Sequence, residues 1–326
     1  MSPYAVTINP KIGYRRYGTI AMAGAAAMLV LLFVFAEGVS LIGTDAVPAR
    51  NWRRLDSHQM LLRHQLNTLR ESPHVVVFGT SRNNMLSPAY LNRPVLNLNY
   101  VYGTPREILK CLRALDPRQI RNIEKIYMLV DYHTLEKGRY PRELDLSFFA
   151  YARDAFRNFT LHRVRVALNT LAINLGMPYP YYVSGDGYVV PASADASTGF
   201  EVAQRFDRNF RLDAADELKE LNGFLQQNKI PAVFYTPTLP TEIVQAFGEE
   251  FISRFTRALA DALGGYYQLI YVPDISGNAR NFSDDSHLNG AGYRKLHLET
   301  DWAKYLVTPA SADERVAQLK AALWRK

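Results

Sequence analysis

The sequence predicts an α/β protein, a three-layer sandwich with a mostly parallel five-stranded sheet, preceded by one N-terminal transmembrane helix. Short runs of large apolar residues, typical of buried strands, alternate along the chain with longer segments of helical periodicity. This alternation favours a parallel sheet with helices on both faces. Near the N-terminus, residues 17–36 form an uncharged run of 20 residues, enough to cross a bilayer core of about 30 Å.

The uncharged run predicts a membrane anchor at residues 17–42. Three basic residues within residues 1–16 precede it, whereas Glu37 and Asp45 come first after it. Because basic residues favour the cytoplasmic side, we expect a cytoplasmic N-terminus, although three further arginines at 50–54 make the count nearly even. A cleaved signal peptide is the alternative, but its apolar core is usually shorter. We therefore expect an uncleaved, single-pass anchor in the cell (inner) membrane, with the rest of the chain extracytoplasmic, which in a bacterium means periplasmic.

The remaining chain divides into a linking helix, at residues 43–72, and one domain, at residues 73–326. Apolar runs predict five strands in that domain, at 75–78, 95–98, 123–130, 230–235 and 269–272. Helical periodicity predicts its longer helices at 201–229, 241–263 and 311–326. An aromatic and basic insertion at about 134–200 interrupts the alternation and includes a hairpin around Gly185-Asp186-Gly187. We expect the insertion to cover the sheet edge.

Composition excludes several classes of function. The net charge of +7 suits an anionic membrane surface or an acidic polymer, and no nucleic-acid-binding signature accompanies it, so we expect no nucleic acid partner. The single cysteine, Cys111, lies in an apolar helical pattern and is expected to be a small buried hydrophobe. No histidine pair has metal-ligand spacing near a cysteine or carboxylate cluster, and no phosphate-binding glycine loop is present, so we predict no metal and no cofactor.

Two short polar motifs follow predicted strands. Gly79-Thr80-Ser81 comes directly after the first strand, at the carboxyl edge where open α/β folds place their ligands. A serine in such a turn is more often a helix cap than a nucleophile. The second motif, Asp284-Asp285-Ser286-His287, follows the last predicted strand. We therefore expect both motifs at the same edge of the sheet.

Together with Gly103 after the second strand, these motifs resemble the SGNH (GDSL) hydrolase superfamily over about residues 74–306. The resemblance implies that Ser81 is a nucleophile, His287 its base and Asp284 the carboxylate that orients the imidazole, with Asp285 as the alternative carboxylate. The chemistry agrees, because a serine hydroxyl attacks well only when a neighbouring base takes its proton and a carboxylate holds the other nitrogen of that base.

The resemblance also implies an oxyanion hole built from the backbone amides of Ser81 and Gly103. The family's third block usually supplies an asparagine as a further donor, but here the third strand is followed by Asp131, and an ionised aspartate only accepts hydrogen bonds. The sequence offers three substitutes without choosing among them: Asn83, Asn97 and Asn99. The candidates for lining the substrate pocket are Arg82, Asp131 and His133.

The first motif reads Gly-Thr-Ser-Arg, which resembles membrane-anchored relatives that modify bacterial envelope polymers, such as alginate O-acetylation proteins and the D-alanyl transfer protein of teichoic acids. This implies a membrane-anchored serine esterase or O-acyltransferase acting on a cell-envelope polysaccharide or glycan, with a multi-span membrane acyltransferase as a candidate partner. The alternative is a catalytically inactive protein of the same fold that binds polymer or docks such an acyltransferase. A third interpretation makes Asp284 and His287 a structural pair in an unrelated α/β domain.

Overall fold

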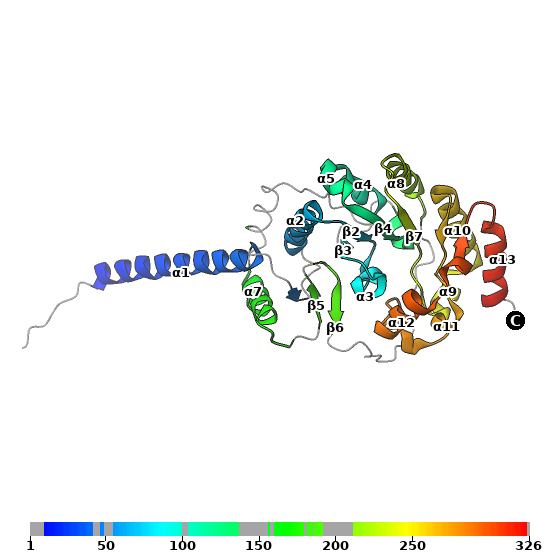
Figure 1. Ribbon diagram of the computed structural model, residues 1–326. Helices are drawn as coiled ribbons and strands as arrows, with labels where there is room; N and C mark the ends of the chain where they lie inside the picture. Colours follow the sequence, from blue (N-terminus) through cyan, green and yellow to red (C-terminus); the bar gives the residue numbers. More distant parts are fainter. Residues whose placement is uncertain are drawn as a thin grey trace, which may run out of the picture.

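One long helix projects from the rest of the protein (Figure 1). The computed structural model describes residues 10–41, 46–48, 55–99, 104–136, 156, 160–178, 181–184, 186–191 and 211–324. The projecting helix, α1 (Pro10–Leu41), contains a stretch, Arg16–Val39, with a mean hydropathy of 2.4, long and apolar enough to cross a membrane. The predicted N-terminal apolar helix is therefore confirmed.

The core of the protein is a mixed, mostly parallel sheet of six strands, in the order β3-β2-β4-β7-β8-β9. Every neighbouring pair is parallel except β8 and β9, which are antiparallel. The strands are β2 (His74–Phe78), β3 (Val95–Asn97), β4 (Ile123–Leu129), β7 (Ala232–Tyr235), β8 (Tyr266–Tyr267) and β9 (Leu306–Val307). The α/β class is confirmed, and β9 adds an antiparallel strand that the sequence did not predict.

The predicted strand at 269–272 is wrong. The fifth strand is β8, only two residues long, and it ends before that apolar run. Leu269, Ile270 and Val272 are nevertheless buried, and Leu239 N–H donates to Ile270 O at 3.2 Å, so this segment lies beside the residues that follow β7. Apolar runs indicate burial, and here burial came without strand pairing.

Residues of β2 alternate between two hydrophobic clusters. Val76 and Phe78 belong to the larger cluster, whereas Val75 and Val77 belong to the other. Successive side chains of a strand point to opposite faces, so both faces of this central strand are buried. The continuous apolar run of β2 follows from this, since a parallel strand buried on both faces has no polar side.

The helices follow the predicted order with two differences. The helix predicted at 201–229 is not helical at residues 211–214 and begins at Ala215. A single helix was predicted over 241–263, but Gly248, at φ +80°, separates two helices there. A residue without Cβ adopts this conformation at little cost. The helices are α2 (Leu55–Glu71), α3 (Pro88–Leu91), α4 (Pro105–Arg113), α5 (Pro117–Arg121), α7 (Leu161–Asn174), α8 (Ala215–Gln227), α9 (Thr241–Phe247), α10 (Glu249–Leu263), α11 (Pro273–Ser276), α12 (Gly290–Arg294) and α13 (Ala312–Leu323).

Helix α2 lies in the segment predicted to link the anchor to the domain. It also packs against the domain. Its Leu62 and Leu69 are buried members of the larger hydrophobic cluster. Its Gln65 side chain donates to Asn97 O at 3.3 Å. Helix α2 is therefore part of the folded core.

A second, three-stranded sheet lies beside the central one. The predicted hairpin is confirmed as β5 (Tyr181–Ser184) and β6 (Val189–Pro191), which pair antiparallel, and β1 (Ala46–Pro48) adds a third strand. Asn97 N–H donates to Asp186 O at 2.7 Å. Gly187, at φ +87°, fits there because a Cβ would lie 2.1 Å from Asn97 O. Much of the predicted insertion at 134–200 lies outside the described residues.

Candidate active site

Ser81 begins a single turn of 3₁₀ helix, η2 (Ser81–Asn83), directly after β2. Thr80 caps this turn, its side chain accepting from Arg82 N–H at 3.4 Å. Gly79 has φ +152°, and a Cβ there would lie 2.9 Å from Leu129 Cβ. A glycine is therefore required for the chain to turn this sharply over β4, which leaves the Ser81 side chain at the carboxyl edge of the sheet.

His287 reaches Ser81 from a loop 206 residues later in the chain, between the turn η4 (Ala279–Asn281) and α12. The loop is closed by an antiparallel bridge between Phe282 and Leu288, and Ser283 N–H donates to His287 O at 2.8 Å. His287 Nε2 lies 2.8 Å from Ser81 Oγ. The structure thus places the two residues expected to be nucleophile and base within hydrogen-bond distance.

Asp284 holds the other side of the His287 ring. Nδ1 lies 2.9 Å from each carboxylate oxygen of Asp284, so Nδ1 carries the proton and Nε2 is left to accept from the serine hydroxyl. Among the described residues no hydrogen bond joins Asp285 to the ring.

The charge of Asp284 is stabilised locally. The backbone N–H groups of Ser286 and His287 each donate to its Oδ1 at 2.8 Å. Burial raises the pKa of Asp284, but the hydrogen bonds and charge of His287 and the hydrogen bonds of Ser286 outweigh burial and hold the pKa well below its usual range. Asp284 therefore stays ionised at neutral pH.

Two predicted pocket residues, Arg82 and Asp131, form an ion pair beneath the serine turn. The Arg82 guanidinium also donates to Tyr132 Oη at 2.9 Å and to Ser286 O at 3.1 Å. It therefore joins the segments that follow β2 and β4 to the loop that carries His287.

Asp131 is fully buried at the centre of this network. It accepts from Thr80 Oγ1 at 3.0 Å and from His133 N–H at 3.2 Å. Burial raises the pKa of Asp131, but the charges of Arg82 and His133 and the hydrogen bonds from these two residues outweigh burial, so the pKa lies below its usual value. His133, the third pocket candidate, packs its ring 4.1 Å from that of Tyr132.

The predicted oxyanion donors differ in what the structure offers. The Ser81 N–H has no hydrogen-bond acceptor within the described part of the chain and so can donate to a developing oxyanion. Gly103 lies outside the described residues. Of the two predicted backbone donors, the structure therefore describes one, the Ser81 N–H.

The three asparagine candidates all donate to neighbouring protein atoms. Asn83 Nδ2 donates to Phe78 O at 3.1 Å. Asn97 Nδ2 donates to the carbonyls of Asn83 and Leu86, at 2.8 and 3.1 Å. Asn99 Nδ2 donates to the Asn84 side chain. These amides stabilise the serine turn, and Asn97 has both hydrogens engaged there.

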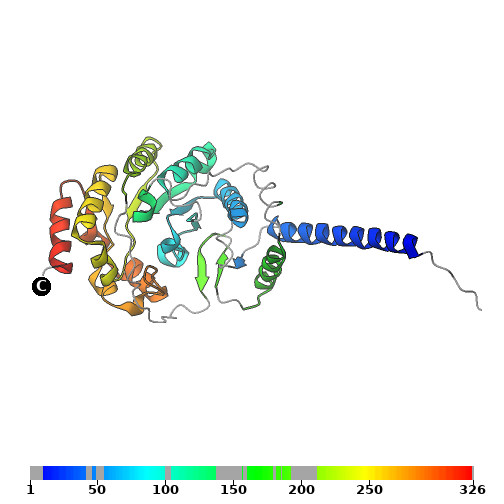
Figure 2. The same ribbon diagram turned by 180° about the vertical axis from the view of Figure 1, so that it is seen from behind.

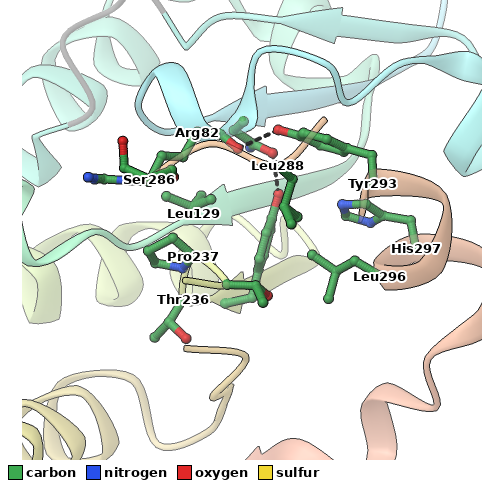
Figure 3. Close-up of a pocket in the computed structure, with 12 residues that line it drawn as sticks. Arg82, Leu129, Thr236, Pro237, Ser286, Leu288, Tyr293, Leu296 and His297 are labelled. Atoms are coloured by element: carbon green, nitrogen blue, oxygen red, sulfur yellow. Dashed lines mark hydrogen bonds between the residues drawn. The ribbon is translucent and has the colours of Figure 1, made fainter. Parts of the chain in front are cut away.

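A pocket lies beside the Ser81, His287 and Asp284 side chains. It is bordered by Arg82 and Ser286 at one end and by Tyr293 and His297 at the other (Figure 3). Two tyrosine hydroxyls hold its wall to the serine turn, Tyr293 donating to Arg82 O and Tyr235 donating to Asn83 Oδ1. Its other lining residues are Leu129, Thr236, Pro237, Thr238, Leu288 and Leu296.

His297 is a pocket residue that the sequence placed only in a helical stretch. It lies in a π-helical turn, η5 (Lys295–Glu299), and stacks on Tyr293 with ring centroids 5.6 Å apart. Burial lowers the pKa of His297 to about 3, so the ring is neutral at physiological pH. Its interrupted helix carried no periodic signal that could have identified this position.

The described part of the chain contains no cluster of three or more histidine, cysteine or acidic side chains placed to hold a metal ion. Comparisons of the chain with models of known protein families, with curated proteins and with solved structures found no match.

Proposed function

We propose that this chain is a membrane-anchored serine esterase or O-acyltransferase of the SGNH type, acting on a cell-envelope polysaccharide or similar glycan. The observation that carries the proposal is the continuous chain of contacts from Ser81 Oγ through the His287 ring to Asp284. Such a chain increases the nucleophilicity of a serine hydroxyl, because the base is oriented and its positive charge is stabilised when it takes the proton.

The residues have distinct roles in the proposed reaction. As Ser81 Oγ attacks the carbonyl carbon of an ester, His287 Nε2 takes the hydroxyl proton and Asp284 stabilises the imidazolium. The Ser81 N–H donates to the oxyanion, with Gly103 proposed as a second donor. Collapse releases the alcohol, which receives the proton from His287. Water or a sugar hydroxyl, deprotonated by His287, then attacks the acyl-enzyme and restores Ser81.

The proposal extends to the fold and the location of the chain. The mostly parallel sheet and the two hydrophobic clusters on opposite faces of β2 support a three-layer SGNH-like sandwich. Helix α1 is proposed as an uncleaved anchor with the N-terminus cytoplasmic and the domain in the periplasm, supported by its apolar length and the basic residues before it. There the domain would meet envelope polymers.

A fluorophosphonate probe and p-nitrophenyl acetate test the nucleophile. Wild-type protein should be labelled and should release nitrophenol, whereas the Ser81→Ala variant should do neither. Ser283→Ala is the matched control, because Ser283 lies in the same loop as His287 but its hydroxyl donates only to the His287 carbonyl at 3.2 Å. Equal labelling of wild type and Ser81→Ala would remove Ser81 from the mechanism.

Absence of labelling in a folded wild-type protein would favour the non-catalytic alternative, in which the domain binds polymer or docks a multi-span membrane acyltransferase. In that case Ser81→Ala should leave the cellular phenotype of the gene intact, while deletion of residues 17–36 should abolish it. The catalytic proposal expects both changes to abolish the phenotype.

A further inference from the structure

One face of α7 is apolar and exposed. Leu168 and Leu171, Leu175 at the end of the helix, and Met177 just beyond it are between 42% and 72% exposed. The spacing of the three leucines places them on one side of the helix. Large apolar side chains gathered on one exposed face indicate an interaction surface.

Helix α7 packs at the root of α1. Arg163 of α7 and Glu37 of α1 form an ion pair at 2.6 Å, with both side chains only 8% exposed. Figures 1 and 2 show α7 on the side of the domain from which α1 projects, running across the direction of α1. A helix in this position runs roughly along the plane of any membrane that α1 crosses.

The direction of the apolar face is constrained by the residues of α7 that are buried. Arg163, Ala167 and Thr170 are buried, on the side of α7 that packs against α1 and β1. At about 100° per residue the three leucines lie roughly 110° around the helix from this buried side, so the leucine face does not point into the domain. Because α7 lies on the side of the domain from which α1 projects, a face of α7 that points out of the domain can face the membrane.

The length of α1 sets the depth of α7. Residues 17–31 are uncharged and exposed throughout, whereas α1 is partly covered from residue 32 onward, apart from Val34, and is buried at Ala36 and Glu37. Fifteen residues span about 22 Å, which is short of a hydrocarbon core of about 30 Å. The bilayer must therefore reach the part of α1 that the domain covers, where α7 packs.

We propose that α7 is an interfacial helix, with Leu168, Leu171, Leu175 and Met177 in the outer edge of the bilayer that α1 spans. The proposal rests on the anchor in the proposed function. The charge of α7 fits a lipid surface, since the helix has no acidic residue and Arg165 is exposed. The Phe156 ring, 77% exposed and 6.2 Å from Phe33 of α1, suits the same layer.

The full-length protein can be tested with spin labels, since its one native cysteine is inert. Cys111 is fully buried, and burial raises the pKa of its thiol to about 12, so an added exposed cysteine is labelled alone. Labels are placed by Leu171→Cys and Leu175→Cys on α7. Leu31→Cys on α1 is the lipid reference, and Leu306→Cys on β9, an exposed leucine on the edge strand of the central sheet, is the aqueous control.

The labelled proteins are reconstituted in nanodiscs of phosphatidylethanolamine and phosphatidylglycerol, and collisions with oxygen and with a water-soluble nickel chelate are compared. The oxygen-to-nickel ratio at both α7 positions should exceed that at Leu306→Cys several-fold and approach that at Leu31→Cys. Ratios at α7 equal to the aqueous control overturn the proposal, as does dipolar broadening between α7 labels, which would indicate a second copy on this face.

These readouts separate the interfacial helix from the proposals on which it rests. An aqueous Leu31→Cys label would reject the anchor and with it the interfacial helix. Failure of fluorophosphonate labelling rejects the catalytic function and leaves the collision ratios unchanged.

Discussion

Replacing Arg82 by methionine should destabilise the domain strongly. The Arg82 side chain is 10% exposed and its partner Asp131 is 0% exposed, so the substitution leaves a carboxylate buried without its main counter-charge. Removing one partner of a buried ion pair costs about 3–5 kcal/mol. This is a large fraction of a typical unfolding free energy of about 5–15 kcal/mol.

A double-mutant cycle isolates the ion pair from the packing of the arginine stem. Asp131→Leu alone leaves the Arg82 charge buried without its counter-charge, whereas the double variant Arg82→Met with Asp131→Leu removes both charges. Replacing a whole buried pair by apolar residues is often close to neutral. The double variant should therefore be more stable than either single variant, which requires a coupling energy of at least about 3 kcal/mol.

Urea unfolding of the full-length protein in detergent, followed by tryptophan fluorescence, measures these differences. Arg113→Met is the matched control, because Arg113 pairs with Glu220 at 2.8 Å on the surface, with the side chains 56% and 57% exposed. Exposed pairs contribute about 0–1 kcal/mol. If Arg82→Met and Arg113→Met shift the unfolding free energy by the same small amount, the reasoning about the buried pair is refuted.

Three further outcomes follow from individual contacts. Asp284→Asn should lower p-nitrophenyl acetate turnover by about 10⁴-fold and Asp285→Asn should not, since the imidazole bonds to Asp284; similar losses in both would reassign the carboxylate. His297 has a folded pKa of about 3 and an unfolded pKa of about 6.5, so its stabilisation is complete above the unfolded value and is lost as pH falls toward the folded one. Urea unfolding should therefore show wild type losing up to about 2 kcal/mol more than His297→Phe between pH 7 and pH 5, and parallel losses would contradict this. In the same assay Gly187→Ala should lower the free energy of unfolding by about 1–3 kcal/mol or more, because the added Cβ would clash with Asn97 O. Unchanged stability would show that the hairpin shifts to make room for the Cβ.

The parts of the fold that depend on local pattern could be predicted from the sequence. The strands β2, β4 and β7 are rich in apolar residues because the sheet buries all or part of each, and each was expected within a few residues of its observed bounds. Their parallel pairing follows from the helices between them. The meeting of Ser81 and His287 could be anticipated from the family resemblance and from the expected position of both motifs at one edge of the sheet. The strand expected directly before the His287 loop was wrong, because α11 and η4 separate β8 from His287.

Contacts between distant segments could not be predicted in the same way. Arg82 and Asp131 were each expected to line the substrate pocket, but their ion pair was not predicted. The two residues are 49 positions apart in the chain, and no local periodicity indicates that their side chains meet. The apolar run at 269–272 is buried without pairing, which its composition cannot distinguish from a strand. Position 248 is one glycine in a helical pattern, and only its backbone angle shows that the helix breaks there.

The three-stranded sheet sets the distance between the membrane surface and Ser81, the proposed nucleophile. Strand β1 is the first strand after α1, it pairs with β5, and β6 donates through Val189 N–H to Asn84 O at 2.7 Å, three residues beyond Ser81. Backbone hydrogen bonds thus link β1, the first strand after the proposed anchor, to the turn that carries the proposed nucleophile. With α1 in a bilayer, the proposed reaction would take place at one fixed distance from the membrane surface. A long polymer would have to approach the membrane to that distance to be modified.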